Sequence, residues 1–399
     1  MKGAAFPLPG RKVLRFAVHY VLPLEGRVPR GLFLWPRMIL RGSPSFPSRL
    51  HVERTLDDLE GASLWPSAGL KGQLAVVGLE GELLPSAAGS QLLHLLKGLL
   101  EEPLFPEAFL DVEKKRVLRD IKGLRDDKEA YLWYRLRERV ARGEIWGLSL
   151  EAMAEEASRC TPEDLFTFHR RLLQDGRLFV GVAGEGAEAF LSSLQEILPP
   201  GSGDPWPPLR PLPPTVDPQE VDEALGGEEA RLLMAYRAGV PWGSREGYVL
   251  RVIHHLLGSS PASRLFQVVR EEKAWSYDVG SHLDRALSLL VLEAAVDEET
   301  LAHAQTAMAD EVAALQEGAI DGKALTSALR LRREELRYER EEPSFLLDES
   351  LEAFLHGRTY RWEEEEEVLN TLELSELSGV AARLRLDTLY RLHPGGASP

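Results

Sequence analysis

The sequence predicts an α+β protein of two tandem homologous domains, each a mixed β-sheet with helices packed on one face. Three observations lead to this prediction. A proline-rich segment lies near the middle of the chain, the same order of elements recurs on either side of it, and long helical segments separate the strands of each half. The length of 399 residues also favours more than one domain.

The proline-rich segment spans residues 199–218 and contains nine prolines and two glycines. Proline lacks a backbone N–H and fixes φ, so this segment can form neither a helix nor a central strand. We therefore expect an extended, semi-rigid linker. It separates a first domain, residues 1–198, from a second domain, residues 219–399.

The two halves repeat one order of elements at an offset of roughly 216 residues. Each half has an alternating strand, an apolar helical stretch that ends in glycine, a second strand and two charged helices. In the first half, Thr161 and the proline after it start a closing helix, and a strand follows. The matching segments are residues 16–20 and 232–236, 31–42 and 248–258, 73–84 and 287–297, 107–127 and 320–341, and 129–142 and 343–356.

Composition excludes several classes of function. The net charge of −16 argues against a nucleic-acid partner, which requires a basic surface. No apolar run approaches the ~20 residues that span a bilayer, and the first residues lack the apolar core of a secretory signal. The single cysteine, Cys160, excludes an intramolecular disulfide and a cysteine zinc cage, and we expect it to be buried. We expect a cytoplasmic protein with no membrane partner.

Residues 259–281, SSPASRLFQVVREEKAWSYDVGS, combine a small-residue loop, a Ser-Arg-Leu-Phe sequence, Arg270 and, seven residues later, Tyr277. This combination closely resembles the signature of the C-terminal domain of pitrilysin/insulinase-family peptidases. Residues 112–131 are similar to a helix in the first domain of that family. The resemblance covers nearly the whole chain. It implies the pitrilysin-like (LuxS-type metallopeptidase) fold, in which pairs of domains close around a peptide chamber.

The catalytic motif of that family is His-x-x-Glu-His, whose histidines bind zinc and whose glutamate is the general base. Residues 38–43, MILRGS, resemble the sequence that follows this motif, which places the motif positions at Phe33, Pro36 and Arg37. Phenylalanine and proline have no donor atom, and a guanidinium repels a metal cation. The resemblance therefore implies that this chain binds no metal and holds no catalytic residue alone.

Two acidic residues remain at the other positions that the resemblance assigns. The third zinc ligand of the family, a downstream glutamate, corresponds to Asp120, and a further helix acid corresponds to Glu113. The adjacent histidines His254 and His255 point ~100° apart on a helix and cannot chelate one ion together. We expect them to be structural, and we expect the acidic run of residues 363–367 to be a solvated helix start.

The resemblance implies that Arg270 and Tyr277 bind substrate. In the family, the arginine contacts substrate carbonyls and the tyrosine hydroxyl helps to hold the developing oxyanion. A lost zinc motif beside this retained pair is similar to the metal-free subunit of two-component zinc peptidases. Residues 56–62 also resemble the metal-less bacterial proteins associated with elongation factor P modification.

This resemblance implies a zinc-bearing homologous partner that hydrolyses peptides as a heterodimer with this chain. Two alternatives stay open. The chain is a scaffold or peptide-binding protein with no peptidase role, or it associates with itself and binds peptides without cutting them.

Overall fold

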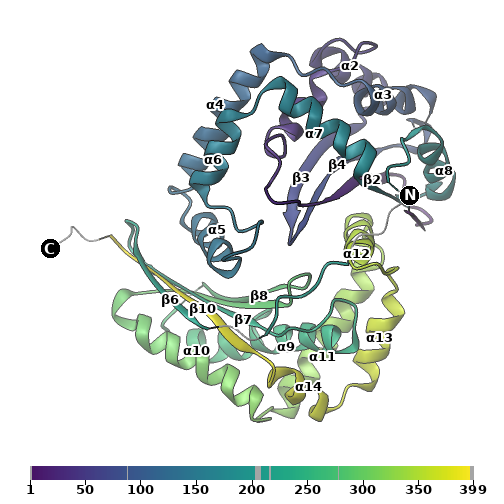
Figure 1. Cartoon of the computed structure of the whole chain (residues 1–399). Helices are drawn as coiled ribbons and strands as arrows, with labels where there is room; N and C mark the ends of the chain where they lie inside the picture. Colours follow the sequence, from purple (N-terminus) through teal and green to yellow (C-terminus); the bar gives the residue numbers. More distant parts are fainter. Residues whose placement is uncertain (1, 88, 203–207, 215–216, 277, 396–399) are drawn as a thin grey trace. The chain divides into compact units, whose positions relative to one another are not determined.

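The computed structural model describes residues 2–87, 89–202, 208–214, 217–276 and 278–395 (Figure 1). The chain divides into two compact units. The first unit comprises Met1–Leu124, Gly143–Leu209 and Glu339–Tyr360; the second comprises Arg125–Arg142, Arg210–Tyr338 and Arg361–Pro399.

The described part of the first unit contains a five-stranded mixed sheet in the order β1-β5-β2-β4-β3. β1 pairs parallel with β5, and the other neighbours pair antiparallel. Alternation along β2 places Phe16, Val18 and Tyr20 in the main core of this unit. The strands are β1 (Lys2–Pro7), β2 (Leu14–Pro23), β3 (Ser63–Lys71), β4 (Leu74–Leu83) and β5 (Arg177–Gly184).

Helices cover the core face of this sheet, and Trp35 is among the largest side chains buried there. Thr161 caps α7 in a capping box with Asp164, as the sequence predicts. The helices of the first unit are α1 (Trp35–Met38), α2 (Arg49–Asp58), α3 (Ser90–Glu101), α4 (Glu107–Gly123), α6 (Leu150–Arg159), α7 (Pro162–Asp175), α8 (Ala187–Ile197) and α12 (Pro343–Leu355).

The second unit repeats this design. The order of strands in its described part is β6-β10-β7-β9-β8, which matches the first sheet strand for strand, including one parallel pair, β6 with β10. Equal strand order in two sheets supports the sequence repeat. The strands are β6 (Gln219–Ala224), β7 (Ala230–Arg237), β8 (Asp278–Asp284), β9 (Leu289–Val296) and β10 (Arg385–His393).

Helices again pack on one face of the sheet, over a core that includes Leu232, Met234 and Leu292. A stretch of π-helix, Phe266–Glu272, precedes β8. The α-helices of the second unit are α5 (Lys128–Val140), α9 (Arg245–Leu257), α10 (Leu301–Gln316), α11 (Gly322–Glu339), α13 (Trp362–Thr371) and α14 (Leu374–Ala381).

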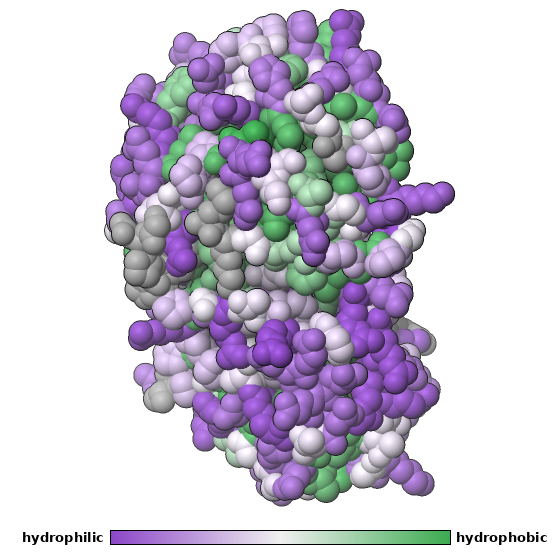
Figure 2. Space-filling view, turned by 90° about the vertical axis from the view of Figure 1, so that its right-hand side faces the viewer, coloured by the Kyte–Doolittle hydropathy of each residue, from purple (hydrophilic) through white to green (hydrophobic). Residues whose placement is uncertain are grey.

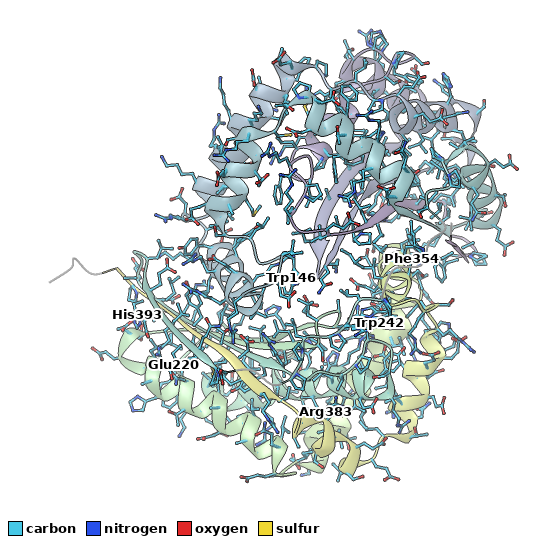
Figure 3. The ribbon with its side chains drawn as sticks, viewed as in Figure 1. Trp146, Glu220, Trp242, Phe354, Arg383 and His393 are labelled. Atoms are coloured by element: carbon cyan, nitrogen blue, oxygen red, sulfur yellow. The ribbon has the colours of Figure 1, made fainter. Side chains whose placement is uncertain are left out.

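Each unit contains one helix from the other half of the sequence. α12 belongs to the first unit, where Leu347 packs against Ala17 and Ala183. These alanines alternate with the main-core residues of their strands, so α12 lies on the opposite face of the sheet. Phe354 lies on the same helix (Figure 3). The centre of its ring is 5.5 Å from that of Phe179.

α5 lies correspondingly on the sheet of the second unit. Tyr131 of α5 and Tyr390 of β10 both donate to the carboxylate of Glu223. Just beyond the end of α5, Arg142 forms an ion pair with the buried Asp387 at 3.0 Å. The domain boundaries expected from the sequence, 1–198 and 219–399, describe the repeat and stay a prediction. The compact units differ from them, because α5 belongs to the second unit and α12 to the first.

The sequence expectation of one continuous helix over residues 31–42 is wrong. α1 covers only Trp35–Met38, and a 3₁₀ turn, Ile39–Arg41, follows it. Pro36 accounts for the late start, because proline has no N–H to donate to a preceding turn. Gly42 ends the segment at φ +128, and a Cβ there would lie 2.2 Å from the carbonyl oxygen of Phe46.

The surface agrees with the composition. On the face drawn in Figure 2, hydrophilic side chains predominate and hydrophobic ones are scattered among them. Cys160 is buried, as predicted. Within the part of the chain that the structure describes, no helix combines the length and apolar character needed to cross a bilayer.

Candidate functional site

The positions that the family resemblance assigns to the zinc site lie together in the first unit. Arg37, on α1, donates from Nη2 to Oδ2 of Asp120 on α4 at 2.7 Å. The other terminal nitrogen of Arg37 lies 3.7 Å from Oε2 of Glu113, about two turns before Asp120 on the same face of α4. The three charged residues that the resemblance assigns to this site, Arg37, Glu113 and Asp120, therefore lie in contact in the structure.

Two further arginines, which the sequence reasoning did not identify, complete this cluster. Arg41 donates to Oε1 of Glu113, and Arg116 donates to the same oxygen at 2.8 Å. The guanidinium of Arg41 also lies over the ring of Phe109, 4.5 Å from its centre. Spacing could have suggested Arg116, which is three residues from Glu113 on the same helix, but not Arg41, which is 72 positions away. We call these five charged residues the Arg37 cluster.

The Arg37 cluster does not fit a zinc ion. Zinc in a catalytic site is bound by nitrogen, sulfur or carboxylate ligands that converge on one point. Here both carboxylates are bound by guanidinium groups, and Phe33 and Pro36 contribute no ligand atoms. Across the described residues, no group of three or more histidine, cysteine, aspartate or glutamate side chains is arranged to hold a metal.

Arg270, the first predicted substrate-binding residue, lies in the π-helix Phe266–Glu272 of the second unit. Leu265 and Val269 anchor this segment in the core. The Arg270 guanidinium lies 4.5 Å from the centre of the Phe266 ring, and 38% of its side chain is exposed. Tyr277, the second predicted residue, lies outside the described residues, so the geometry of the pair stays a prediction.

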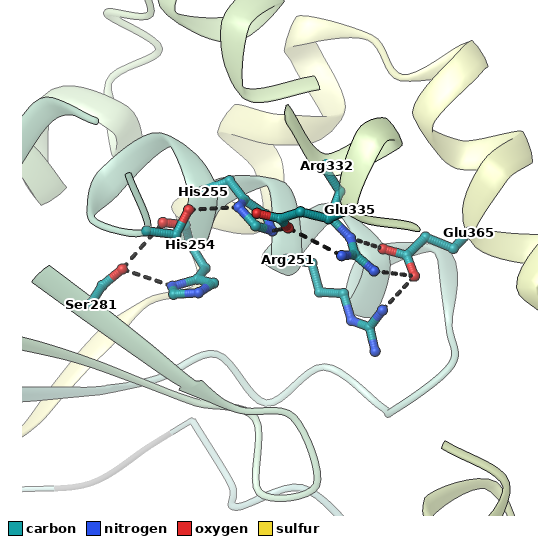
Figure 4. Close-up of polar contacts among 8 residues, drawn as sticks. Arg251, His254, His255, Ser281, Arg332, Glu335 and Glu365 are labelled. Carbon is teal, nitrogen blue, oxygen red and sulfur yellow. Dashed lines mark hydrogen bonds and ion pairs between the residues drawn. The ribbon is translucent and has the colours of Figure 1, made fainter. Parts of the chain in front are cut away.

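A buried polar network lies beside the loop that leads to Arg270 (Figure 4). Glu365 of α13, only 1% exposed, accepts from Arg332 of α11 at 2.7 Å and also binds Arg251 of α9. The expectation that the acidic run of residues 363–367 is solvated is therefore wrong for Glu365. A signal was available, because Glu365 shares helical spacing with the buried Val368 and Leu369.

The adjacent histidines of α9 hold the start of the same loop. His255 Nδ1 lies 2.6 Å from Oγ of Ser259, and His254 Nδ1 lies 2.7 Å from Oγ of Ser281 on β8. Burial lowers the pKa of His255 to about 3 and that of His254 to about 4, so both rings are neutral near pH 7. Their structural role agrees with the sequence expectation.

Comparisons with known proteins extend this picture. The family description "Peptidase M16 inactive domain" matches residues 159–331, which include the Arg270 segment. The probable inactive metalloprotease YmfF of Bacillus subtilis is 22% identical over 306 residues, covering 71% of this chain and 70% of that protein. Residues 159–331 thus resemble the inactive domain of the peptidase M16 family.

The matched family and the first of these relatives are both described as inactive. This agrees with the residues at the three motif positions, Phe33, Pro36 and Arg37. Bacillus subtilis also has a relative described as the uncharacterized zinc protease YmxG, 22% identical over 313 residues, covering 77% of this chain and 76% of that protein. A conserved protein from Enterococcus faecalis V583 has the same fold, with a TM-score of 0.86, 18% identity and coverage of 98% of this chain and 96% of that one.

Proposed function

We propose that this chain is the metal-free subunit of a heteromeric zinc peptidase. It supplies Arg270 and Tyr277 to orient a peptide that a zinc-bearing partner hydrolyses. The observation that carries this proposal is a contrast between the two units. The metal positions of the first unit are filled by the Arg37 cluster, whereas Arg270 in the second unit is half-exposed on an anchored segment.

The chemistry of Arg270 supports a substrate-facing role. A guanidinium donates several hydrogen bonds in a fixed plane, which suits the carbonyl oxygens of an extended peptide. π-helices are rare and are frequent at functional sites. Leu265 and Val269 fix the backbone around Arg270, so little ordering would be needed when a peptide binds. The peptide itself would lie extended, as an added strand.

The relatives support a division of labour between two chains. One organism contains both a relative described as inactive and a relative described as a zinc protease. In our proposal, zinc and the general base come from a partner of the second type. This chain then contributes no step of bond cleavage and acts by holding the peptide. The single cysteine suits a reducing compartment, and we place the complex in the cytoplasm.

The test is reconstitution with a zinc-bearing homologous subunit. The mixture should hydrolyse an unstructured peptide, and this chain alone should not. Arg270→Ala should then reduce the kcat/KM of the mixture while leaving assembly, measured by sedimentation, unchanged. The proposal would be opposed if Arg270→Ala weakened assembly but left the turnover of each assembled complex unchanged.

A second candidate is a scaffold or a peptide-binding protein without a peptidase role, either with a partner or as a self-associated dimer. The extensive ion pairing of the Arg37 cluster favours it, because such pairing can serve stability alone. Normal turnover of the reconstituted complex with both Arg270→Ala and Tyr277→Phe would select this candidate.

A further inference from the structure

We propose that Arg37 is a built-in replacement for a metal cation in the first unit. Its guanidinium takes over the positive charge that Glu113 and Asp120 require and joins α1 to α4. The two acids are then retained as partners of an arginine, and not as remnants of a metal site. This inference concerns the first unit alone and does not depend on the proposed function.

Geometry favours a guanidinium over an ion at this place. Glu113 and Asp120 are seven residues apart on α4, which places them on one face and about 10 Å apart along the helix axis. The two terminal nitrogens of Arg37 diverge, and each approaches a different carboxylate, at 2.7 Å for Asp120 and 3.7 Å for Glu113. A planar fork can bridge two separated carboxylates in this way.

Burial explains why Glu113 needs such a partner, whereas the side chain of Asp120 is 58% exposed. Glu113 is 3% exposed, and an ionised carboxylate at that depth is costly unless cations and hydrogen bonds compensate it. Arg41 and Arg116 contact Oε1 of Glu113, and Arg37 approaches Oε2, so both oxygens face positive charge. Removing Arg37 would take away the guanidinium that lies 3.7 Å from Oε2 of Glu113.

The same charges exclude a divalent ion. The Arg37 cluster contains three guanidinium groups and two carboxylates, so its net charge is positive. A zinc ion entering here would meet fixed positive charges within a few ångströms, at a distance that salt does not screen. We therefore expect the exclusion of zinc to be a property of the cluster, beyond the missing histidines.

Thermal unfolding of a double-mutant cycle tests this inference in the full chain. The variants are Arg37→Met, Asp120→Asn and the combination of both. Arg37→Met should lower the Tm by about 2–6 °C, because Glu113 loses one of its compensating charges. The combined variant should unfold no lower than Arg37→Met, because Asp120 has then already lost its partner.

A matched exposed pair provides the control. Arg49 Nε lies 2.7 Å from Glu53 Oε1, four residues along α2, and both side chains are more than half exposed. Arg49→Met and Glu53→Gln should each shift the Tm by about 1 °C or less. The inference is overturned if Arg37→Met behaves like this control, or if the Tm shifts of Arg37→Met and Asp120→Asn simply add.

Metal analysis provides a second, independent readout. The purified chain, dialysed against excess zinc and then against buffer, should retain no stoichiometric zinc at the Arg37 cluster. One zinc per chain that is lost in Asp120→Asn would also overturn the inference.

Discussion

Arg37 and Asp120, which lie 83 positions apart in the sequence, are joined by a 2.7 Å ion pair between α1 and α4. Both stand where the family resemblance places zinc ligands. A positively charged residue therefore occupies a ligand position and binds the acid that remains. In the first unit, a salt-bridge cluster therefore stands at the positions where the resemblance places the metal ligands.

Arg270→Ala should lower the kcat/KM of the reconstituted peptidase by about 10–100-fold, because a charge-assisted donor to the bound peptide is lost. Arg330→Ala is the matched control, since Arg330 is an exposed arginine elsewhere in the second unit. The control should retain full activity. Equal losses in both variants would show that Arg270 acts only through general surface charge.

Because α12 packs on the sheet of the first unit, we expect the stability of the protein to depend on Leu347 of this helix. This side chain is buried against Ala17 and Ala183, and its terminal methyl group occupies the space that a Cβ at Gly181 would need. Leu347→Ala should lower the free energy of unfolding by about 2–4 kcal/mol. Leu374→Ala, at an exposed leucine, should change it by less than about 0.5 kcal/mol. Denaturant titration measures both, and equal effects would contradict the packing of α12.

Glu365→Gln should destabilise the second unit by about 3–5 kcal/mol, because Arg251 and Arg332 would lose the carboxylate that compensates both charges in a buried setting. Glu363→Gln changes the same kind of residue two positions away, at an exposed site. It should have almost no effect in the same denaturant titration. A small effect of both substitutions would mean that the buried network is dispensable.

Stability should fall as the pH is lowered from 6.5 towards 4. His255 and His254 have pKa values lowered by burial to about 3 and about 4, so the unfolded chain binds more protons than the folded chain over this window. Above pH 6.5 these histidines do not change the free energy of unfolding with pH. Below pH 6.5, each lowers the free energy of unfolding by up to about 1.4 kcal/mol per pH unit.

The variant His255→Gln isolates one of these groups. The difference in unfolding free energy between the wild type and this variant should shrink between pH 7 and pH 4.5. His282 has a pKa raised by its bond to Glu293 and contributes with the opposite sign, but it is present in both proteins. A difference that is constant with pH would show that His255 does not titrate on unfolding.

The elements of the fold were largely accessible from the sequence, because strand alternation and helical spacing are local properties. Phe16, Val18 and Tyr20 indicated β2 and its buried face without reference to any partner. Pro36 also indicated that the segment around α1 could not be a regular helix throughout, yet the residues on both sides favoured one.

The sequence did not predict that α5 belongs to the second unit and α12 to the first. The apolar face of α12 shows that Leu347 is buried, but periodicity does not state which sheet buries it. Arg41 was missed for the same reason, because Arg41 and Glu113 lie 72 positions apart and meet only once the 3₁₀ turn Ile39–Arg41 packs against α4. Glu365 was hidden in a run of identical residues, where charge suggested solvent and only spacing suggested burial.

Peptide hydrolysis measured in three mixtures tests the central claim most directly. These are the chain alone, a zinc-bearing homologous subunit alone, and the two together, each with and without a metal chelator. The account predicts that only the mixture has full activity, that the chelator abolishes it, and that the chain alone is inactive. Cleavage by the isolated chain that the chelator stops would contradict it.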